Sequence, residues 1–318
     1  MITSFDEYVG PAAGVATAML WTLTTVFFTE AGRRIGPTFV NAFRILLAIV
    51  LHAVTYRFLA GSWLPDAIPG QVLYLACSGV IGLAVGDQAL FVAFLDVGPR
   101  LSTLLMSMSP LFAVFFGWIV LGERLEGFAW LGVAMVLGGV FWVVMERPDA
   151  GLVTHGQHRT RGVILGLVAA ACQAGGLLLS KQGIGHGWLA EGDRLTPQAA
   201  TLVRMFFAGI GMLPILAIYR SRERRRLARG IPTMQFSSPA GGIALTAAGA
   251  LVGPYLGVWM SLVASDRAPL GIAQTLCSLT PIFILPVAVV LYKERVSPRA
   301  AIGAFIAVGG SAVLFLTT

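Results

Sequence analysis

The chain has 318 residues, of which 57% are hydrophobic and only 12% are charged, and its mean hydropathy is +0.82. Soluble proteins carry about twice that share of charged residues, so this composition excludes a soluble globular protein and indicates a chain that lies mostly in lipid. The net charge of +7 is then no indication of nucleic-acid binding, because in a membrane protein such an excess reports which loops face the cytoplasm.

Apolar segments of roughly 18–24 residues recur along the chain, which is the length at which a helix crosses the hydrocarbon core of a bilayer. Short turn-forming stretches such as Gly36-Pro37 and Gly98-Pro99 separate them. The sequence therefore predicts an all-α polytopic membrane protein. Its ten transmembrane helices are expected at residues 11–30, 38–60, 71–95, 100–121, 127–146, 162–181, 198–219, 241–264, 269–291 and 298–316.

The chain also contains an internal repeat. At an offset of 171 residues, Ser107-Met108-Ser109-Pro110 recurs as Ser278-Leu279-Thr280-Pro281, and the glycines at positions 82, 86, 138 and 139 recur at 253, 257, 309 and 310. In the second span of each copy the offset is 160 residues, which carries Pro37 onto Pro197 and Arg44 onto Arg204. The repeat predicts two homologous units, residues 11–146 and 162–316, with a basic loop at residues 220–239 in the second.

Each unit has five predicted spans, and this odd number has a topological consequence. The second copy must enter the membrane from the side opposite to the first, so the two five-helix repeats are expected to be inverted. Inverted repeats of this kind are common in secondary transporters, which place the substrate site between the two halves.

Lys and Arg residues outside the predicted spans are unevenly distributed. The loops on the side of the termini carry only Arg57, Arg124, Lys181, Arg194 and Arg267, whereas the opposite loops carry the remainder, including the six arginines of residues 220–229. The positive-inside rule then predicts cytoplasmic basic loops and non-cytoplasmic termini in a cell inner (plasma) membrane. The basic loop at 220–239 is either a topology signal alone or also a contact with anionic lipid headgroups.

Each copy carries a Ser/Thr-Pro in its fourth span, at Pro110 and Pro281, and a Glu-Arg pair at the end of that span, Glu123-Arg124 and Glu294-Arg295. With two five-helix repeats, this pattern resembles the drug/metabolite transporter superfamily, specifically the EamA-type permeases, over nearly the whole chain. The resemblance implies export or exchange of small organic metabolites, often amino acids, by alternating access. It also implies a central cavity lined by helices one, three, four, six, eight and nine.

Few ionisable residues lie within the predicted spans, and three of them are candidate site residues. A charged Arg or Asp at the centre of a membrane helix costs roughly 2.5–3.5 kcal/mol on insertion scales, so Arg44, Asp87 and Arg204 are expected to face the bundle interior. Arg44 and Arg204 occupy equivalent positions and are expected either to bind backbone carbonyls or to contact the substrate.

Asp87 breaks the symmetry of the repeat, because the equivalent position in the second copy is Val258. One hypothesis makes Asp87 the group that takes up a proton or a coupling cation. The alternative is a structural ion pair with Arg44 or a hydrogen-bonded helix contact next to Gly86.

Pro110 and Pro281 each remove a backbone donor in the middle of a span. They are interpreted either as hinges or as static kinks that free a carbonyl one turn earlier. Ser107 and Ser278, three residues before each proline, can satisfy such freed groups and are expected on a polar cavity wall.

Aromatic and amide side chains within the spans complete the predicted substrate site. Trp21, Tyr255 and Trp259 are not at span ends, so they are candidates to line a pocket for an organic substrate. The hydrogen-bonding candidates are Gln88, Gln173 and Gln274. Core or lipid-facing packing is the alternative for all of them.

The rival functions are a membrane-embedded enzyme, a channel and a scaffold without carrier activity. The sequence contains no HExxH motif and no Gly-rich phosphate loop, and we predict no catalytic residue, no metal ligand and no cofactor. Cys77, Cys172 and Cys277 lie far apart within apolar segments and are expected to be small core residues. The sequence indicates neither the substrate, the driving ion nor the oligomeric state.

Overall fold

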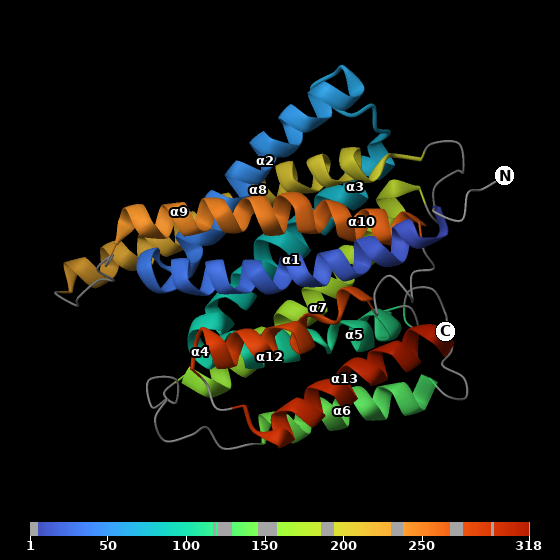
Figure 1. The fold of residues 1–318 in the computed structure, drawn as a ribbon. Helices are drawn as coiled ribbons and strands as arrows, with labels where there is room; N and C mark the ends of the chain where they lie inside the picture. The colour runs from blue at the N-terminus through green and yellow to red at the C-terminus, as the bar shows by residue number, and fades with distance from the viewer. Residues whose placement is uncertain are drawn as a thin grey trace.

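The computed structural model describes residues 6–116, 119, 129–145, 158–185, 194–229, 238–267, 276–293 and 296–317, and these residues form helices joined by turns, with no strand among them. Figure 1 shows the resulting helical bundle. In chain order the helices are α1 (Asp6–Ile35), α2 (Pro37–Ala60), α3 (Pro69–Ser78), η1 (Gly79–Gly86), α4 (Asp87–Met106), α5 (Ser109–Phe116), α6 (Ala129–Val144), α7 (Arg159–Ile184), α8 (Pro197–Ala228), α9 (Pro239–Ala250), η4 (Leu251–Gly257), α10 (Val258–Arg267), α12 (Thr280–Val290) and α13 (Pro298–Thr317).

Proline and glycine set many of the helix ends. Helices α2, α3, α8 and α9 each begin with a proline in the first turn, where the missing N–H has no intrahelical partner to lose. Gly61 and Gly185 end α2 and α7 in the left-handed conformation, which glycine adopts without a Cβ penalty. These local signals are the same ones that separated the spans in the sequence.

Within the described residues, six helices are long and apolar enough to cross a membrane, and three shorter apolar helices accompany them. One of the six, Pro69–Met106, is interrupted at Gly98, whose φ of 81° and ψ of 164° are not helical. Large apolar side chains such as Leu46, Phe141 and Leu213 are exposed on the bundle, as suits a lipid solvent. The number of ten spans stays a prediction, because the expected fourth and ninth spans include residues outside the described ranges.

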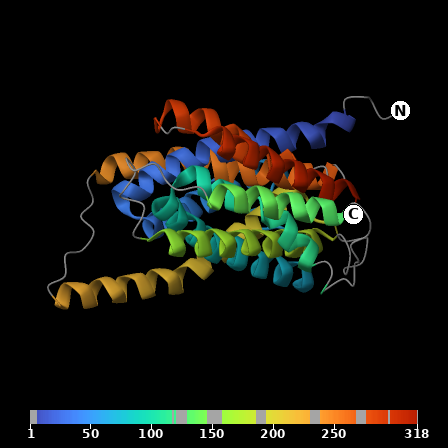
Figure 2. The ribbon, with the colours of Figure 1, turned by 90° about the horizontal axis from the view of Figure 1, so that it is seen from below.

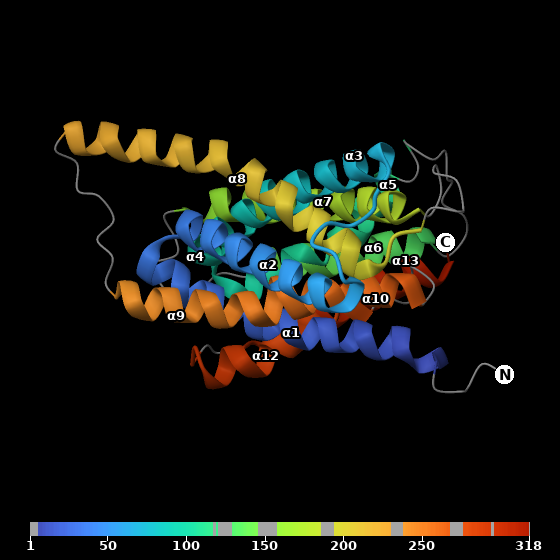
Figure 3. The same cartoon turned by 90° about the horizontal axis from the view of Figure 1, so that it is seen from above.

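Helix α8 corrects one expectation. The sequence analysis placed the seventh span at 198–219 and a loop at 220–239, but α8 continues as helix to Ala228, because arginine, glutamate, leucine and alanine are all good helix formers. The basic end of α8 projects from the bundle (Figures 2 and 3). It lies at the opposite end from the first residues of α1 and the last residues of α13 (Figure 1).

The first helix of each copy packs against helices of the other copy. Helix α1 packs on α9, η4 and α10 of the second copy, and α7 packs on α3, η1 and α4 of the first; α2 packs on α8, and α6 on α13. Gly139 of α6 lies against the backbone of Gly303 in α13, and Gly310 of α13 lies against that of Gly132 in α6. Since Gly132 and Gly303 are equivalent, as are Gly139 and Gly310, the two fifth helices run antiparallel.

The irregular parts of the helices also repeat. The π-helical segments η1 and η4 end at the equivalent glycines Gly86 and Gly257. Two-residue turns at 107–108 and 278–279 separate α4 from α5 and precede α12. The predicted kinks are therefore located more finely: Pro110 and Pro281 lie in the first turn of the helix that follows each break, where the missing N–H of a proline would have no intrahelical partner.

Candidate functional site

A cavity of about 150 Å³ lies between the two copies. A cavity of roughly this volume can hold a benzene-sized group. Its wall includes residues from both copies at equivalent positions: Leu83 with Pro254, Asp87 with Val258, Ser107 with Ser278, Ser109 with Thr280, and Arg44 with Arg204. Corresponding parts of the two copies therefore line the same cavity.

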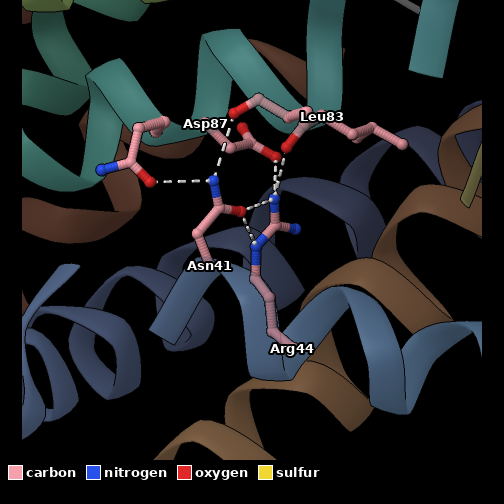
Figure 4. Close-up of polar contacts among 6 residues, drawn as sticks. Asn41, Arg44, Leu83 and Asp87 are labelled. Atoms are coloured by element: carbon pink, nitrogen blue, oxygen red, sulfur yellow. Dashed lines mark hydrogen bonds and ion pairs between the residues drawn. The ribbon is translucent and has the colours of Figure 1, made fainter. Parts of the chain in front are cut away.

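Arg44 is the best-satisfied charged group in this wall. Its Nε and Nη2 donate to Oδ1 of Asn41 at 3.0 and 2.8 Å, and Nη2 also donates to the carbonyl of Leu83 at 2.9 Å and pairs with the Asp87 carboxylate (Figure 4). Its guanidinium carbon lies 4.9 Å from the ring centroid of Phe91, a cation–π distance. Arg44 therefore binds both a backbone carbonyl and a carboxylate, as two of the sequence interpretations proposed.

Asn41 links this ion pair to a second layer of polar groups. Its amide Nδ2 donates to the carbonyl of Ala84 at 3.1 Å and to Oε1 of Gln88 at 3.3 Å, and Gln88 in turn donates to Thr38 at 2.9 Å. The chain of hydrogen bonds fixes α2 against η1 and α4. Gln88 thus orients Asn41 and is not among the described residues that line the cavity.

Arg204 contrasts with Arg44, although the two arginines are equivalent in the repeat. Arg204 is only 4% exposed and lines the cavity, but its Nε has no hydrogen-bond partner. In the part of the chain that the structure describes, its guanidinium forms no ion pair; Asp87 acts on it only through the longer-range Coulomb interaction. Gly82 is its neighbour: a Cβ at this position would lie 3.7 Å from Nη2, at ordinary van der Waals distance.

Comparison with known proteins decides the family. The profile of the EamA-like transporter family matches residues 9–145 and residues 160–316, so the match occurs twice and covers most of the chain. The chain belongs to the EamA-like transporter family. The family relation makes it a multi-pass membrane protein, and it points to a transporter rather than an enzyme.

Two further similarities are more limited. Over 38 residues this EamA-like protein is 42% identical to YdzE, a permease-like protein of Bacillus subtilis (strain 168); the match covers 12% of the chain and 49% of YdzE, so the chain spans about half the length of this relative. A solved structure titled "Crystal structure of protein" matches with a TM-score of 0.63 at 19% identity, over 96% of both chains. At that identity the solved structure supports the fold alone.

The structure brings several predicted site residues of the EamA-like chain together at the cavity. Trp21, Gln173, Ser107 and Ser278 line it beside Arg44 and Asp87, and so does Pro281. The hydroxyl oxygen of Ser107 is buried without a hydrogen-bond partner. Gln274 lies outside the described residues, and Pro110 is buried next to the wall without being part of it.

Tyr255 and Trp259 are placed elsewhere. The Tyr255 hydroxyl is 2.7 Å from Oγ1 of Thr55, and its ring centroid lies 5.0 Å from that of His52 and 6.2 Å from that of Trp259. The Nε2 of His52 is 3.1 Å from the carbonyl of Pro254. These contacts join α2 to η4 and α10, and neither Tyr255 nor Trp259 is among the described residues that line the cavity.

Some site residues were missed by the sequence analysis. Asn41, which holds Arg44 without lining the cavity itself, was missed, although an amide three residues before an arginine in an apolar helix is a recognisable pairing signal. Phe28, Phe91 and Phe94 line the cavity, but phenylalanines in an apolar span carry no signal that separates them from packing residues. The family resemblance implied a cavity without the second and seventh predicted spans, yet these spans, which correspond to α2 and α8, supply Arg44 and Arg204.

The cysteine expectation is partly wrong. Cys277 is buried and Cys172 is half-buried, but Cys77 is exposed on α3, because a thiol is apolar enough for a lipid-facing position as well as for a core. Among the described residues no cluster of His, Cys, Asp and Glu has the geometry of a metal site.

Proposed function

We propose that this protein is a secondary transporter that moves a small organic metabolite by alternating access. Two inverted five-helix halves rock about the cavity that holds Arg44, Asp87 and Arg204, and the protein works as an exporter or an exchanger. The observation that carries the proposal is the composition of the cavity wall, to which seven pairs of equivalent residues from the described parts of the two copies contribute. Inverted-repeat carriers build their substrate sites in this way.

The helix breaks beside the cavity are the proposed hinges of the transport cycle. The turns at 107–108 and 278–279 interrupt equivalent helices beside the cavity, and Ser107 and Ser278 lie in its wall. A break in a membrane helix is tolerated where it faces a cavity or protein. Each break divides one helix into two segments that can tilt separately, and Pro110 and Pro281 are the second residues of the segments that follow the breaks.

Asp87 is the proposed coupling group. Both members of the pair line the cavity, but the Asp87 side chain is 17% exposed and that of Arg44 only 3%, so the carboxylate is the more accessible of the two. Uptake of a proton or a cation there would weaken the ion pair to Arg44 and loosen α2 from α4.

The basic extension of α8 defines the proposed orientation. Residues 220–229 carry six arginines and lie at the end of the bundle opposite to α1's start and α13's end (Figure 1). The positive-inside rule places this extension in the cytoplasm and the termini outside, in an inner membrane. Paired fusions of alkaline phosphatase and green fluorescent protein after Thr318 test the orientation; fluorescence without phosphatase activity would reverse it.

Counterflow in proteoliposomes tests the carrier mechanism. A thermal-shift screen of metabolites first supplies a ligand, and unlabelled ligand inside the vesicle should then accelerate uptake of labelled ligand. A channel gives flux without this trans-stimulation, and a scaffold gives neither flux nor a ligand-dependent thermal shift. Chemical conversion of the ligand would instead indicate a membrane-embedded enzyme.

A further inference from the structure

Arg44 and Arg204 occupy equivalent positions in the two copies, but their side chains have different bonding partners. Arg44 has a carboxylate partner in Asp87, two bonds to Asn41 and one to the Leu83 carbonyl. Arg204 has none of these, and its Nε is buried and unpartnered. A buried guanidinium without a counter-charge is costly, so its place in the cavity wall requires an explanation.

The missing partners can be traced to particular positions. The residue equivalent to Asp87 is Val258, which is buried and also lines the cavity. The residue equivalent to Asn41 is Thr201, whose hydroxyl donates to the carbonyl of Pro197 in its own helix. The carbonyl equivalent to that of Leu83 belongs to Pro254 and bonds to His52. Each group that satisfies Arg44 is therefore absent or engaged around Arg204.

The charges of the cavity do not cancel. Among the described residues of its wall, Arg44 and Arg204 are cationic and Asp87 is anionic, which leaves one positive charge. Asp87 is within Coulomb range of Arg204 but is held by Arg44. One monoanion entering the cavity would balance this charge. Its place beside Arg204 would correspond to the place of the Asp87 carboxylate beside Arg44.

The rest of the wall indicates the body of the ligand. Phe28, Phe91, Phe94 and Trp21 give the cavity an aromatic surface, and its volume of about 150 Å³ suits a single ring or a short alkyl chain. A planar carboxylate matches the guanidinium fork in a bidentate manner. The unpartnered hydroxyl of Ser107 offers one further hydrogen bond to a polar substituent.

We propose that Arg204 binds the carboxylate of a small monocarboxylate substrate with an aromatic or apolar body, and that this carboxylate replaces the acid which the second copy lacks at Val258. The inference rests on the proposed function, since it names the substrate class of the same cavity.

Binding of three matched probes to the purified protein tests the charge preference. Benzoate, benzamide and benzylamine share one ring and differ in charge, and Trp21 in the wall provides a fluorescence readout beside calorimetry. Benzoate is expected to bind at least about tenfold more tightly than benzamide, as for a charge-assisted hydrogen-bonded pair, and benzylamine is expected not to bind. Equal affinity for benzoate and benzamide, or preference for benzylamine, overturns the proposal.

Two substitutions locate the site. Arg204→Gln should weaken benzoate binding at least about tenfold, whereas Arg224→Gln, at an exposed arginine of the α8 extension, should leave it unchanged. Val258→Asp should supply Arg204 with an internal carboxylate and abolish benzoate binding without loss of thermal stability, while Val258→Asn keeps the binding. If Val258→Asp binds benzoate like the wild type, the assignment of Arg204 is wrong.

The failures of the two proposals are distinguishable. A carrier that shows counterflow with a neutral or cationic ligand, and whose transport is unaffected by Arg204→Gln, refutes the anion site and leaves the transport function standing. If benzoate binds with the expected pattern but no ligand is exchanged across the vesicle membrane, the anion site stands and the carrier function fails.

Discussion

Separating Arg44 from Asp87 should destabilise the protein far more than removing both. Arg44→Met keeps the length of the side chain but leaves the Asp87 carboxylate without its counter-charge, and leaves Oδ1 of Asn41 and the carbonyl of Leu83 without their donor. Loss of one partner of a buried ion pair costs about 3–5 kcal/mol. Because Asp87 is 17% exposed toward the cavity, water reaches it, and we expect about 3 kcal/mol.

The double variant Arg44→Met with Asp87→Leu removes both charges and fills the space with apolar atoms. Replacing a buried pair in this way is often neutral or stabilising. The double variant should therefore lose only the hydrogen bonds to Asn41 and Leu83, which lowers its free energy of unfolding by about 1 kcal/mol. Asp87→Leu alone leaves Arg44, whose side chain is 3% exposed, without its counter-charge and should also cost about 3 kcal/mol. The coupling energy of the double-mutant cycle should therefore be at least about 3 kcal/mol in favour of the native pair.

Reversible unfolding by sodium dodecyl sulfate in bicelles gives the free energy of unfolding of each variant. The pair of Asp96 with Arg161 is the comparison: its two hydrogen bonds are 2.8 and 2.7 Å long, and Asp96 is 6% exposed, but the side chain of Arg161 is 55% exposed. Because water still reaches this guanidinium, the coupling energy should be smaller than that of the Arg44 pair, about 1 kcal/mol. If Arg44→Met costs no more than breaking this comparison pair, or if the double variant is as unstable as the two single variants added together, the Arg44 pair is not a buried, mutually dependent unit.

Three other predictions address coupling, packing and the hinge. Asp87→Asn should abolish the pH dependence of counterflow while ligand binding persists, and an unchanged pH profile would remove Asp87 from coupling. Gly139→Ala should lower stability by about 2 kcal/mol, because its Cβ would lie 2.6 Å from a backbone oxygen of α13, whereas Gly138→Ala, whose Cβ would meet nothing within 4 Å, should be neutral in the same unfolding assay; equal effects would contradict the close helix contact. Pro281→Ala should change stability by less than about 1 kcal/mol, since the proline lies in a first turn, yet should slow counterflow severalfold; an unchanged rate would make the break static.

Much of the fold was predictable from the sequence because the signals are local. Lipid requires long apolar helices, and proline and glycine mark where many of them begin and end. The repeat offset of 171 residues led to the prediction of kinks at Pro110 and Pro281, close to the breaks that the structure has at 107–108 and 278–279. Local signals failed at the arginine-rich end of α8, which was predicted to be a loop. The charged residues there mark the end of the apolar span, but they do not end the helix, because arginine is a good helix former.

The candidate site was predictable only in part. Arg44, Asp87 and Arg204 were identifiable because a charge in hydrocarbon is costly and must face a partner or a cavity. Tyr255 and Trp259 were candidates for the substrate pocket, with core or lipid-facing packing as the alternative; Tyr255 contacts His52 and Trp259, and neither aromatic lines the cavity. Their spans are apolar around most of the helix, so periodicity does not indicate which side faces the cavity.

By itself the sequence determined that this chain lies in a membrane, that it is a duplicated unit, and that one copy has an acid where the other has Val258. Only the tertiary structure decided that Arg44 takes that acid and that Arg204 is left facing the cavity without one. The physical reason is distance along the chain: Arg44 and Asp87 are 43 residues apart, and their pairing depends on how α2 packs against α4, which no local pattern of residues encodes.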